Sequence, residues 1–354
     1  MGTECQPVRG FEFRVSIFEF RVSLFGSQNM RIIHDLRQLP KPPRPSVVTI
    51  GNFDGVHLAH QRLLRRVVET ARPLGATAIA VTFDPHPIQF LAPEHAPKLV
   101  TTLERKARLI ENLGIDLLVV LPFNRELAHL SPLEFVRRTL REGLHAVSVH
   151  VGPHFRFGYR QSGDVEVLAE IARQERLRLE VLPTVEVRGE RVSSTRIREL
   201  LSLGCVSLAG RLLGRPFSVF GPIVAGFGVG HKHTVPTLNL ASGQEQIPKI
   251  GVYVTRTRLG EAVHDSVTNV GHKPTFGNHR LSVETHLLNF AGEVKETSTE
   301  IEFFYRLRDE MKFHNPAILK AQIQEDARRA LKFFRLLRRF QERRSPHPAR
   351  TLIT

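Results

Sequence analysis

A chain of 354 residues, 41% hydrophobic and 24% charged, is long enough for two domains that each have a core. Its two cysteines, Cys5 and Cys205, lie far apart and form no Cys-X-X-Cys pair. This argues against a disulfide framework or a cysteine zinc site and favours a reducing cytoplasm. No run of about eighteen uncharged apolar residues occurs, so we expect no membrane-spanning segment. The net charge of +15 favours polyanionic or phosphorylated partners.

Both ends of the chain differ from the pattern between them. FEFRVS occurs at residues 11–16 and again at 18–23, without the basic start and apolar core of a signal peptide. We therefore expect residues 1–29 to be an extension outside the fold, and the first domain to begin at Met30. Residues 335–354 form a basic tail, which we interpret as a solvated helix end and terminus because no aromatic recognition module accompanies it. We expect neither a nucleic-acid partner nor a membrane.

From Met30 onward, short apolar runs alternate with amphipathic stretches. Strands are predicted at 47–50, 76–83, 115–121, 146–151 and 178–183. Helices are predicted between them, at 58–72, 102–113, 131–143 and 164–176. The third helix opens with Ser131 and Glu134 at capping-box spacing. This order predicts a Rossmann-like parallel sheet in an α/β domain at residues 30–203, with ligands at the carboxyl ends of the strands.

The second half of the chain has a different pattern. A helical link is expected at 195–213, with Gly204 as a C-cap. Residues 217–308 then show Gly and Pro punctuation and short alternating runs, which predict an antiparallel barrel or sandwich. Its strands are expected at 252–258, 282–290 and 299–308. A long amphipathic helix, roughly 316–340, closes this domain, which we place at residues 204–334.

The stretch GNFDGVHLAH, residues 51–60, is the first candidate site. On a helix that starts near His57, both His57 and His60 lie on the side that packs against the sheet, at the amino end of the helix. Backbone amides and the helix dipole favour an anion there, and two imidazoles beside it can donate hydrogen bonds to phosphate oxygens. Two alternatives stay open from these residues alone: a core role for His60, or a zinc site that includes His86.

A second segment, VSSTRIRELL at residues 192–201, follows the fifth predicted strand. Three hydroxyl residues begin a helix whose first turn carries Arg196 and Arg198. Cations at the start of a helix oppose its dipole, and a polyphosphate opposite them would offset that cost. We therefore expect this segment and residues 51–60 to converge on one crevice.

These motifs, taken in chain order, resemble a known family. TIGNFDGVH (49–57), TFDPHP (82–87), VGPHFRFG (151–158) and VSSTRIR (192–198) are together similar to the adenylyltransferase module of bacterial bifunctional riboflavin kinase/FAD synthetase. The resemblance covers residues 47–200 and implies a nucleotidyltransferase in which the phosphate of FMN attacks the α-phosphate of ATP and releases pyrophosphate. Positioning and charge stabilisation carry such a reaction, which needs no covalent protein nucleophile.

The resemblance also implies which residues form this site. Those that stabilise the ATP phosphates in catalysis are His57 and His60. Those that bind ATP or the departing pyrophosphate are Gly51, Phe53, Asp54, Gly55, Ser194, Thr195 and Arg198. Those that bind the flavin are His154, Phe155 and Phe157. Two positions depart from the family pattern: Ala59 replaces a glycine, so we expect modest crowding of the phosphates, and His154 replaces Asn or Asp.

The second half carries its own candidate site. GPIVAGFGVGHKHTVPTLNL, residues 221–240, has a glycine-rich run followed by Pro-Thr-Leu-Asn. In a strand, Thr237 and Asn239 face the same way, so a hydroxyl and an amide oxygen can share a hard cation. Glu284 is an acid within an apolar strand, and periodicity alone favours a solvent-facing position for it.

Across residues 204–334 these segments resemble the riboflavin kinase module of the same family. The resemblance implies a six-stranded barrel that transfers the γ-phosphoryl of ATP to the 5′-hydroxyl of riboflavin. The residues implied are Gly226, Gly228 and Gly230 for ATP, Thr237 and Asn239 for Mg²⁺, Glu284 as general base, and Arg308 and Phe313 over the flavin. Because Thr237, Asn239 and Glu284 are retained, we expect an active kinase. Val229 and His231 stand where the family has arginines, so we expect its ATP binding to be weakened.

We therefore expect a cytoplasmic enzyme that makes FMN from riboflavin and FAD from FMN, using two Mg²⁺-ATP and releasing pyrophosphate, with no tightly bound prosthetic group. One alternative is a nucleotidyltransferase whose degenerate barrel has weak or no kinase activity. A second is a nucleotidyltransferase for another acceptor, such as nicotinamide mononucleotide. A third is a non-catalytic protein that binds flavin or RNA.

Overall fold

The computed structural model describes residues 30–39, 44–224, 237–272 and 281–344. They form two compact units, which divide between Arg196 and Ile197. In the part of the chain that is described, no helix is both long enough and apolar enough to cross a membrane. The extension expected at residues 1–29 and the end of the basic tail lie outside the described residues.

The first unit is built on a six-stranded parallel sheet. In spatial order its strands are β1 (Arg31–Ile33), β4 (Leu117–Pro122), β3 (Thr77–Asp84), β2 (Ser46–Ile50), β5 (Ala146–Val151) and β6 (Arg178–Val181). Every neighbouring pair is parallel, which confirms the predicted fold class. The five expected strands are present within two residues at each end. β1 was not expected, because three residues are too few to show a period.

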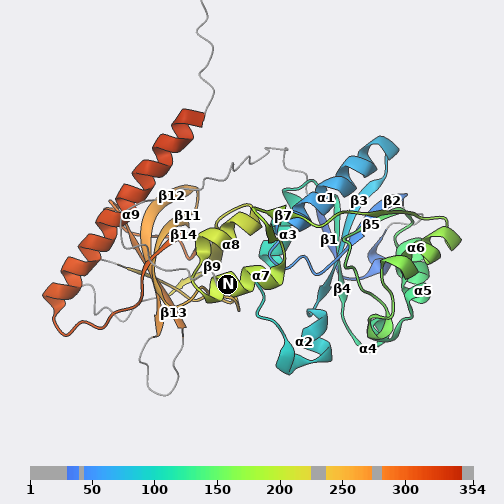
Figure 1. The fold of residues 1–354 in the computed structure, drawn as a ribbon, viewed down its shortest axis with the longest axis horizontal. Coiled ribbons are helices and arrows are strands. Elements are labelled where there is room, and N and C mark those ends of the chain that lie inside the picture. The colour runs from blue at the N-terminus through green and yellow to red at the C-terminus, as the bar shows by residue number, and fades with distance from the viewer. Residues whose placement is uncertain (1–29, 40–43, 225–236, 273–280, 345–354) are drawn as a thin grey trace, which may run out of the picture. The chain divides into compact units, whose positions relative to one another are not determined.

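Helices cover both faces of this sheet (Figure 1). On one face, α1 (Leu58–Ala71) and α3 (Leu103–Glu111) bury apolar side chains against β2, β3 and β4. On the other, a π-helix (Phe135–Gly143) and α6 (Val165–Gln174) complete a second apolar layer. The shorter elements are α2 (Pro87–Leu91), α4 (Arg125–His129), α5 (Pro132–Glu134), β7 (Glu186–Val187) and β8 (Glu190–Arg191).

The helix predicted at 131–143 starts as expected but winds differently. The Ser131 hydroxyl accepts the Glu134 N–H at 3.2 Å, and the Glu134 carboxylate accepts the Ser131 N–H at 3.0 Å, which confirms the capping box. After the single turn of α5, residues 135–143 are π-helical rather than α-helical. The wider turn places Phe135 and Leu140, five residues apart, together in the core.

The second unit is a closed antiparallel barrel, as predicted. Its six strands, in order around the barrel, are β10 (Leu238–Leu240), β13 (Leu281–Leu287), β12 (Ala262–His272), β11 (Gly251–Leu259), β14 (Ser298–Arg308) and β9 (Phe217–Val224). The sequence indicated β11, β13 and β14 but not the other three. α9 (Pro316–Arg344) packs along the outer face of β11 and β12 through Ala330, Phe333 and Phe334 (Figure 1).

The helical link before the barrel consists of two helices rather than one. α7 (Ser194–Ser202) and α8 (Val206–Leu213) are separated by a turn in which Gly204 has a φ of 78°. A left-handed residue of this kind ends the first helix and lets the chain change direction.

Hydroxyl groups fill the interior of the barrel. Five completely buried residues contribute them: Thr255, Thr257, Ser266, Thr268 and Thr285. Their oxygens lie 2.7 to 3.2 Å apart in a connected network across β11, β12 and β13. Each hydroxyl lies within hydrogen-bond distance of two others, so each can donate to one neighbour and accept from the other.

A buried histidine in the first unit makes the stability of the fold depend on pH. His150 of β5 is completely buried, with Nε2 at 3.1 Å from the Ser148 hydroxyl and Nδ1 at 3.6 Å from the Glu180 carboxylate. Burial lowers the pKa of His150 to about 4, although Glu180 opposes the shift. Above pH 6.5 the ring is neutral in the folded and the unfolded chain. Between pH 6.5 and about 4 only the unfolded chain takes up the proton, so the folded state loses stability.

We predict that His150→Gln reduces this pH dependence, because glutamine takes up no proton. In the wild type His150 should contribute a loss of up to about 3 kcal/mol in the free energy of unfolding as the pH falls through this window. Urea unfolding between pH 7 and pH 4.5 measures the difference. The exposed His95, replaced in the same way, is the matched control. An unchanged pH slope in His150→Gln would contradict the assignment.

Candidate active sites

A cavity of about 240 Å³ opens at the carboxyl ends of β2 and β5. From β2 the chain continues to β3 and β4 in one direction across the sheet, and from β5 it continues to β6 in the opposite direction. The strand order therefore reverses between these two neighbouring strands. Such a switch point is where α/β sheets bind their ligands. The predicted site residues that line the cavity are Gly51, Phe53, His57, His60, His154 and Phe155. The fold therefore brings together two motifs that lie far apart in the sequence. The methyl group of Ala59 also faces this space.

The two histidines of the first motif are in direct contact. His57 is the N-cap of α1, and its Nδ1 accepts the backbone N–H of His60 at 3.3 Å. The neutral ring of His57 therefore carries its proton on Nε2. The two rings stack with their centroids 3.5 Å apart. Burial, together with His57 and Lys106, lowers the pKa of His60 well below its usual range, so His60 is neutral near pH 7.

The third histidine considered with them, His86, has another role. Its Nδ1 accepts the N–H of Ile88 at 3.3 Å and so caps α2. Within the described residues, no group of three or more His, Cys, Asp or Glu side chains is arranged to hold a metal ion. The zinc alternative therefore has no support in this part of the chain.

The loop between β2 and α1 is held by the side chain of Asp54. Its carboxylate, only 2% exposed, accepts the N–H groups of Val100 at 2.9 Å and Thr101 at 3.1 Å. Gly55, with a φ of 81°, donates its N–H to the Thr101 hydroxyl at 3.1 Å. We expected Asp54 to bind ATP or phosphate. Its carboxylate binds backbone amides and so shapes the loop, while its contact with ATP or phosphate stays a prediction.

Aromatic rings form one wall of the cavity. The ring of Phe53 lies edge-on to His60, with centroids 5.3 Å apart, and a Cβ at Gly51 would come within 3.2 Å of that ring. Phe155 lines the cavity and stacks on Phe157 at 5.3 Å. Phe157 itself belongs to the core. Phe157 therefore supports Phe155 from behind, and the contacts of both rings with flavin stay predictions.

The start of α7 is tied to the same loop. The Ser194 hydroxyl donates to the backbone carbonyl of Asp54 at 2.9 Å. Arg196, which we expected to face phosphate, forms an ion pair with Glu190 of β8 at 2.9 Å. The remaining predicted residues of this helix are Thr195 and Arg198. Their contacts with phosphate stay predictions.

The second candidate site lies on the outer face of the barrel. The register pairs Asn239 of β10 with Glu284 of β13, and Glu284 with Asn269 of β12. Side chains alternate along a strand and Thr285 faces the interior, so these three side chains form one outward row. Asn239 is buried and Glu284 is half-buried. Two motifs that are separate in the sequence thus become neighbours across one strand pair.

The structure describes the surroundings of some of the other predicted barrel residues but not of all of them. Gly226, Gly228 and Gly230 lie outside the described residues. Thr237 is exposed and directly precedes β10. Arg308 forms an ion pair with the buried Asp326 of α9 at 2.8 Å, and its guanidinium lies 5.9 Å from the ring centroid of Phe313. This ion pair fixes β14 to α9, and the closure of Arg308 over the flavin stays a prediction.

Comparisons with known proteins match each of the two domains to a separate family model. Family models match residues 39–196 as FAD synthetase and residues 213–334 as riboflavin kinase. The bifunctional riboflavin kinase/FMN adenylyltransferase of Pseudomonas fluorescens is 37% identical over 305 residues, which cover 85% of this chain and 98% of that protein. The protein of the same name from Escherichia coli (strain K12) is 33% identical over 308 residues, covering 87% and 98%. This chain belongs to that bifunctional family.

A solved structure supports the fold of this member of the bifunctional riboflavin kinase/FMN adenylyltransferase family. A crystal structure described as a macrolide-efflux protein from Streptococcus pneumoniae is 27% identical, with a TM-score of 0.76. The match covers 84% of this chain and 97% of that one. The same succession of parallel sheet and closed barrel therefore extends over most of both chains.

Two residues near these sites were not indicated by the sequence. One is Asn269, which was missed because β12 was not predicted. The other is Lys106 of α3, only 6% exposed, whose Nζ donates to the Thr82 hydroxyl at 3.4 Å. That hydroxyl donates to the carbonyl of Asn52 in the active-site loop. One sequence feature could have indicated Lys106: it is a lysine at an apolar position of an amphipathic helix, between Leu103 and Ile110.

Proposed function

We propose that this chain adenylylates FMN in the cavity beside His57 and His60, and phosphorylates riboflavin on the outer face of the barrel beside Glu284. The FMN made at the second site is the substrate of the first, so the chain converts riboflavin to FAD in two steps. The pair of stacked imidazoles in a cavity at the switch point of the sheet carries this proposal. We place both reactions in the cytoplasm.

FAD formation is an adenylyl transfer. An oxygen of the FMN phosphate attacks the α-phosphorus of ATP, the bond from that phosphorus to the oxygen bridging it to the β-phosphate breaks, and pyrophosphate leaves. His57 donates from Nε2, the neutral ring of His60 donates one hydrogen bond, and the amides at the start of α1 add further donors. The residues proposed to bind the departing pyrophosphate are Ser194, Thr195 and Arg198. Those proposed to bind the flavin are His154 and Phe155.

FMN formation is a phosphoryl transfer. Glu284 accepts the proton of the ribityl 5′-hydroxyl as that oxygen attacks the γ-phosphorus of ATP. Enzymes of these families use ATP and typically a divalent metal. The Asn239 amide oxygen and the Thr237 hydroxyl are hard donors that suit Mg²⁺, which would neutralise charge on the phosphates. Asn269 lies opposite Glu284 in the register, and its Nδ2 donates to the Glu310 carboxylate at 3.5 Å.

We predict that His60→Ala and Glu284→Gln separate the two activities. His60→Ala removes a donor to the ATP phosphates and should lower FAD formation from FMN about a hundredfold or more, while FMN formation stays at the wild-type rate. Glu284→Gln removes the base and should lower FMN formation by a similar factor, while FAD formation from supplied FMN is spared. Chromatographic separation of riboflavin, FMN and FAD measures both.

Each variant serves as the control for the other, because both come from the same full-length protein. Circular dichroism establishes that the two variants are folded. Equal loss of both activities in either folded variant would rule out the assignment of one reaction to each site.

We further propose that Lys106 stabilises the charge of ATP in the first site. Burial lowers the pKa of Lys106, while the carboxylates of Asp54 and Asp84 raise it, and no described carboxylate lies within ion-pair distance of its Nζ. The charge of Lys106 reaches the cavity, because it contributes to the lowered pKa of His60. A buried cation of this kind is costly unless an anion approaches it, and the ATP phosphates are the anions that the site receives.

We predict that Lys106→Met lowers kcat/KM for ATP in FAD formation at least about tenfold, since one hydrogen bond to a charged group is worth about 1.5–3 kcal/mol. Methionine keeps the length and apolar stem of the side chain, so the melting temperature should stay the same or rise as a buried charge is removed. FMN formation should not change. Wild-type FAD formation in the folded variant would contradict a role in charge stabilisation, and a lower melting temperature would indicate a structural role.

A further inference from the structure

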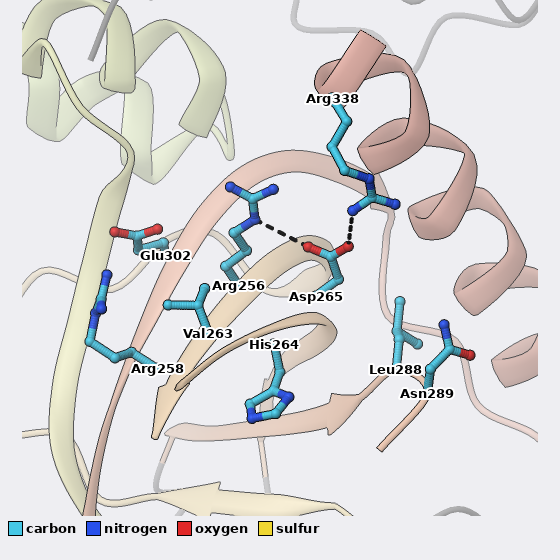
Figure 2. Close-up of a pocket in the computed structure, with 9 residues that line it drawn as sticks. All are labelled: Arg256, Arg258, Val263, His264, Asp265, Leu288, Asn289, Glu302 and Arg338. Carbon is cyan, nitrogen blue, oxygen red and sulfur yellow. Dashed lines mark hydrogen bonds and ion pairs between the residues drawn. The ribbon is translucent and has the colours of Figure 1, made fainter. Parts of the chain in front are cut away.

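A second cavity, of about 600 Å³, lies outside the barrel, where β11, β12 and β14 face α9 (Figure 2). Its charged lining residues are Arg256, Arg258, Asp265, Glu302 and Arg338. None of them belongs to the residues that we assign to the two reactions. Three guanidinium groups face two carboxylates in this space, so the lining carries a net positive charge.

Two of the arginines are fixed around one carboxylate. Arg256 Nε lies 3.1 Å from one oxygen of Asp265, and Arg338 Nη1 lies 2.8 Å from the other, as Figure 2 shows. The guanidinium of Arg256 also lies over the rings of Phe334, at 4.8 Å, and Phe304, at 5.4 Å. These contacts hold Arg256 in one orientation, so a ligand that binds it need not pay for ordering a flexible side chain.

Most of the guanidinium donors are unused. Within the described residues, the two Nη groups of Arg256 form no hydrogen bond, and neither do Nε and Nη2 of Arg338. Arg258, exposed on the same strand as Arg256, has no side-chain hydrogen bond or ion pair there. The cavity therefore presents several unpaired guanidinium donors beside the carboxylate of Asp265, which Arg256 and Arg338 already bind.

We propose that this cavity binds a small molecule that carries a phosphate group. A guanidinium donates two parallel hydrogen bonds that match the oxygens of a phosphate, and here two of the groups are already oriented. The volume lies within the range of small-molecule sites. Val263 and Leu288 supply apolar surface in the same cavity for the organic part of the ligand. A concave site of this size suits a compact ligand better than the extended backbone of a nucleic acid.

This cavity is separate from the kinase residues along the same strand. Arg258 pairs with Val263 near the β11–β12 turn, whereas Asn269, in the row with Glu284, lies six residues further along β12. At about 3.3 Å per residue, Val263 and Asn269 are about 20 Å apart. Substitutions at Arg258 should therefore leave both reactions unchanged.

A fluorine label on the wall of the cavity tests binding at this place and not at the active sites. In the full-length chain, Cys5 is replaced by serine, Cys205 is buried, and Val263, 46% exposed, is replaced by cysteine and labelled with a trifluoroethyl group. Titration with inorganic pyrophosphate should give a saturable change in the ¹⁹F NMR shift. Arg258→Gln in the labelled protein should weaken the apparent affinity about tenfold, because one charge-assisted contact is lost.

Arg328→Gln is the matched control, because Arg328 is an exposed arginine of α9 that does not line the cavity, and it should leave the titration unchanged. The absence of a saturable shift at millimolar pyrophosphate would overturn the proposal. An equal response to sodium chloride at the same ionic strength, or the same affinity in Arg258→Gln, would also overturn it.

Two further measurements separate the remaining outcomes. The first is the affinity for single-stranded RNA of increasing length. If longer RNA binds more tightly and salt weakens that binding steeply, the surface binds nucleic acid and the small-molecule proposal is wrong. FMN and FAD formation by Arg258→Gln should equal the wild-type rates. Loss of either activity would show that the cavity is part of an active site and not a separate one.

Discussion

The buried carboxylate of Asp54 is the constraint on which the first site depends. It binds the backbone amides of Val100 and Thr101, and the backbone carbonyl of the same residue accepts the hydroxyl of Ser194. One residue therefore fixes three segments that are far apart in the sequence, before any substrate is bound. Because the loop is fixed, α1 begins at a defined residue and its two imidazoles lie against each other. In the reaction that we propose, an entering phosphate would meet donors that need little rearrangement, which is what electrostatic stabilisation of a transition state requires.

Side-chain periodicity predicted many of the strands, although the longer strands β9 and β12 were not indicated. β5 begins and ends at the expected residues, because alternating Val and polar residues bounded by a turn are typical of a strand. β1 and β10 have three residues each, too few to show a period, and only pairing with their neighbours forms them. The π-helical winding of residues 135–143 could not be predicted from the sequence either. Nine residues do not distinguish it from an α-helix, and the packing of Phe135 and Leu140 decides the winding.

Motif spacing indicated both candidate sites but not the contacts that their charged side chains form within the fold. Asp54 and Arg308 lie in segments that resemble substrate-binding motifs, yet one binds backbone amides and the other binds Asp326. A carboxylate or guanidinium gives the same sequence pattern whether it binds a ligand or holds the loop that does. Lys106 is the opposite case. Its sequence pattern is that of an ordinary amphipathic helix, and only the fold shows that its ammonium group lies under the active-site loop.

The hydroxyl network inside the barrel limits how that half of the protein can evolve. Replacing one of its threonines by valine keeps the shape but leaves a neighbouring hydroxyl without a partner, which costs more than the hydrogen bond itself contributed. Replacing the whole set by apolar residues leaves no such group. Sequences part-way between these two interiors are therefore less stable than either. We expect the five positions to vary together among relatives, so that the interior of the barrel is inherited as a unit.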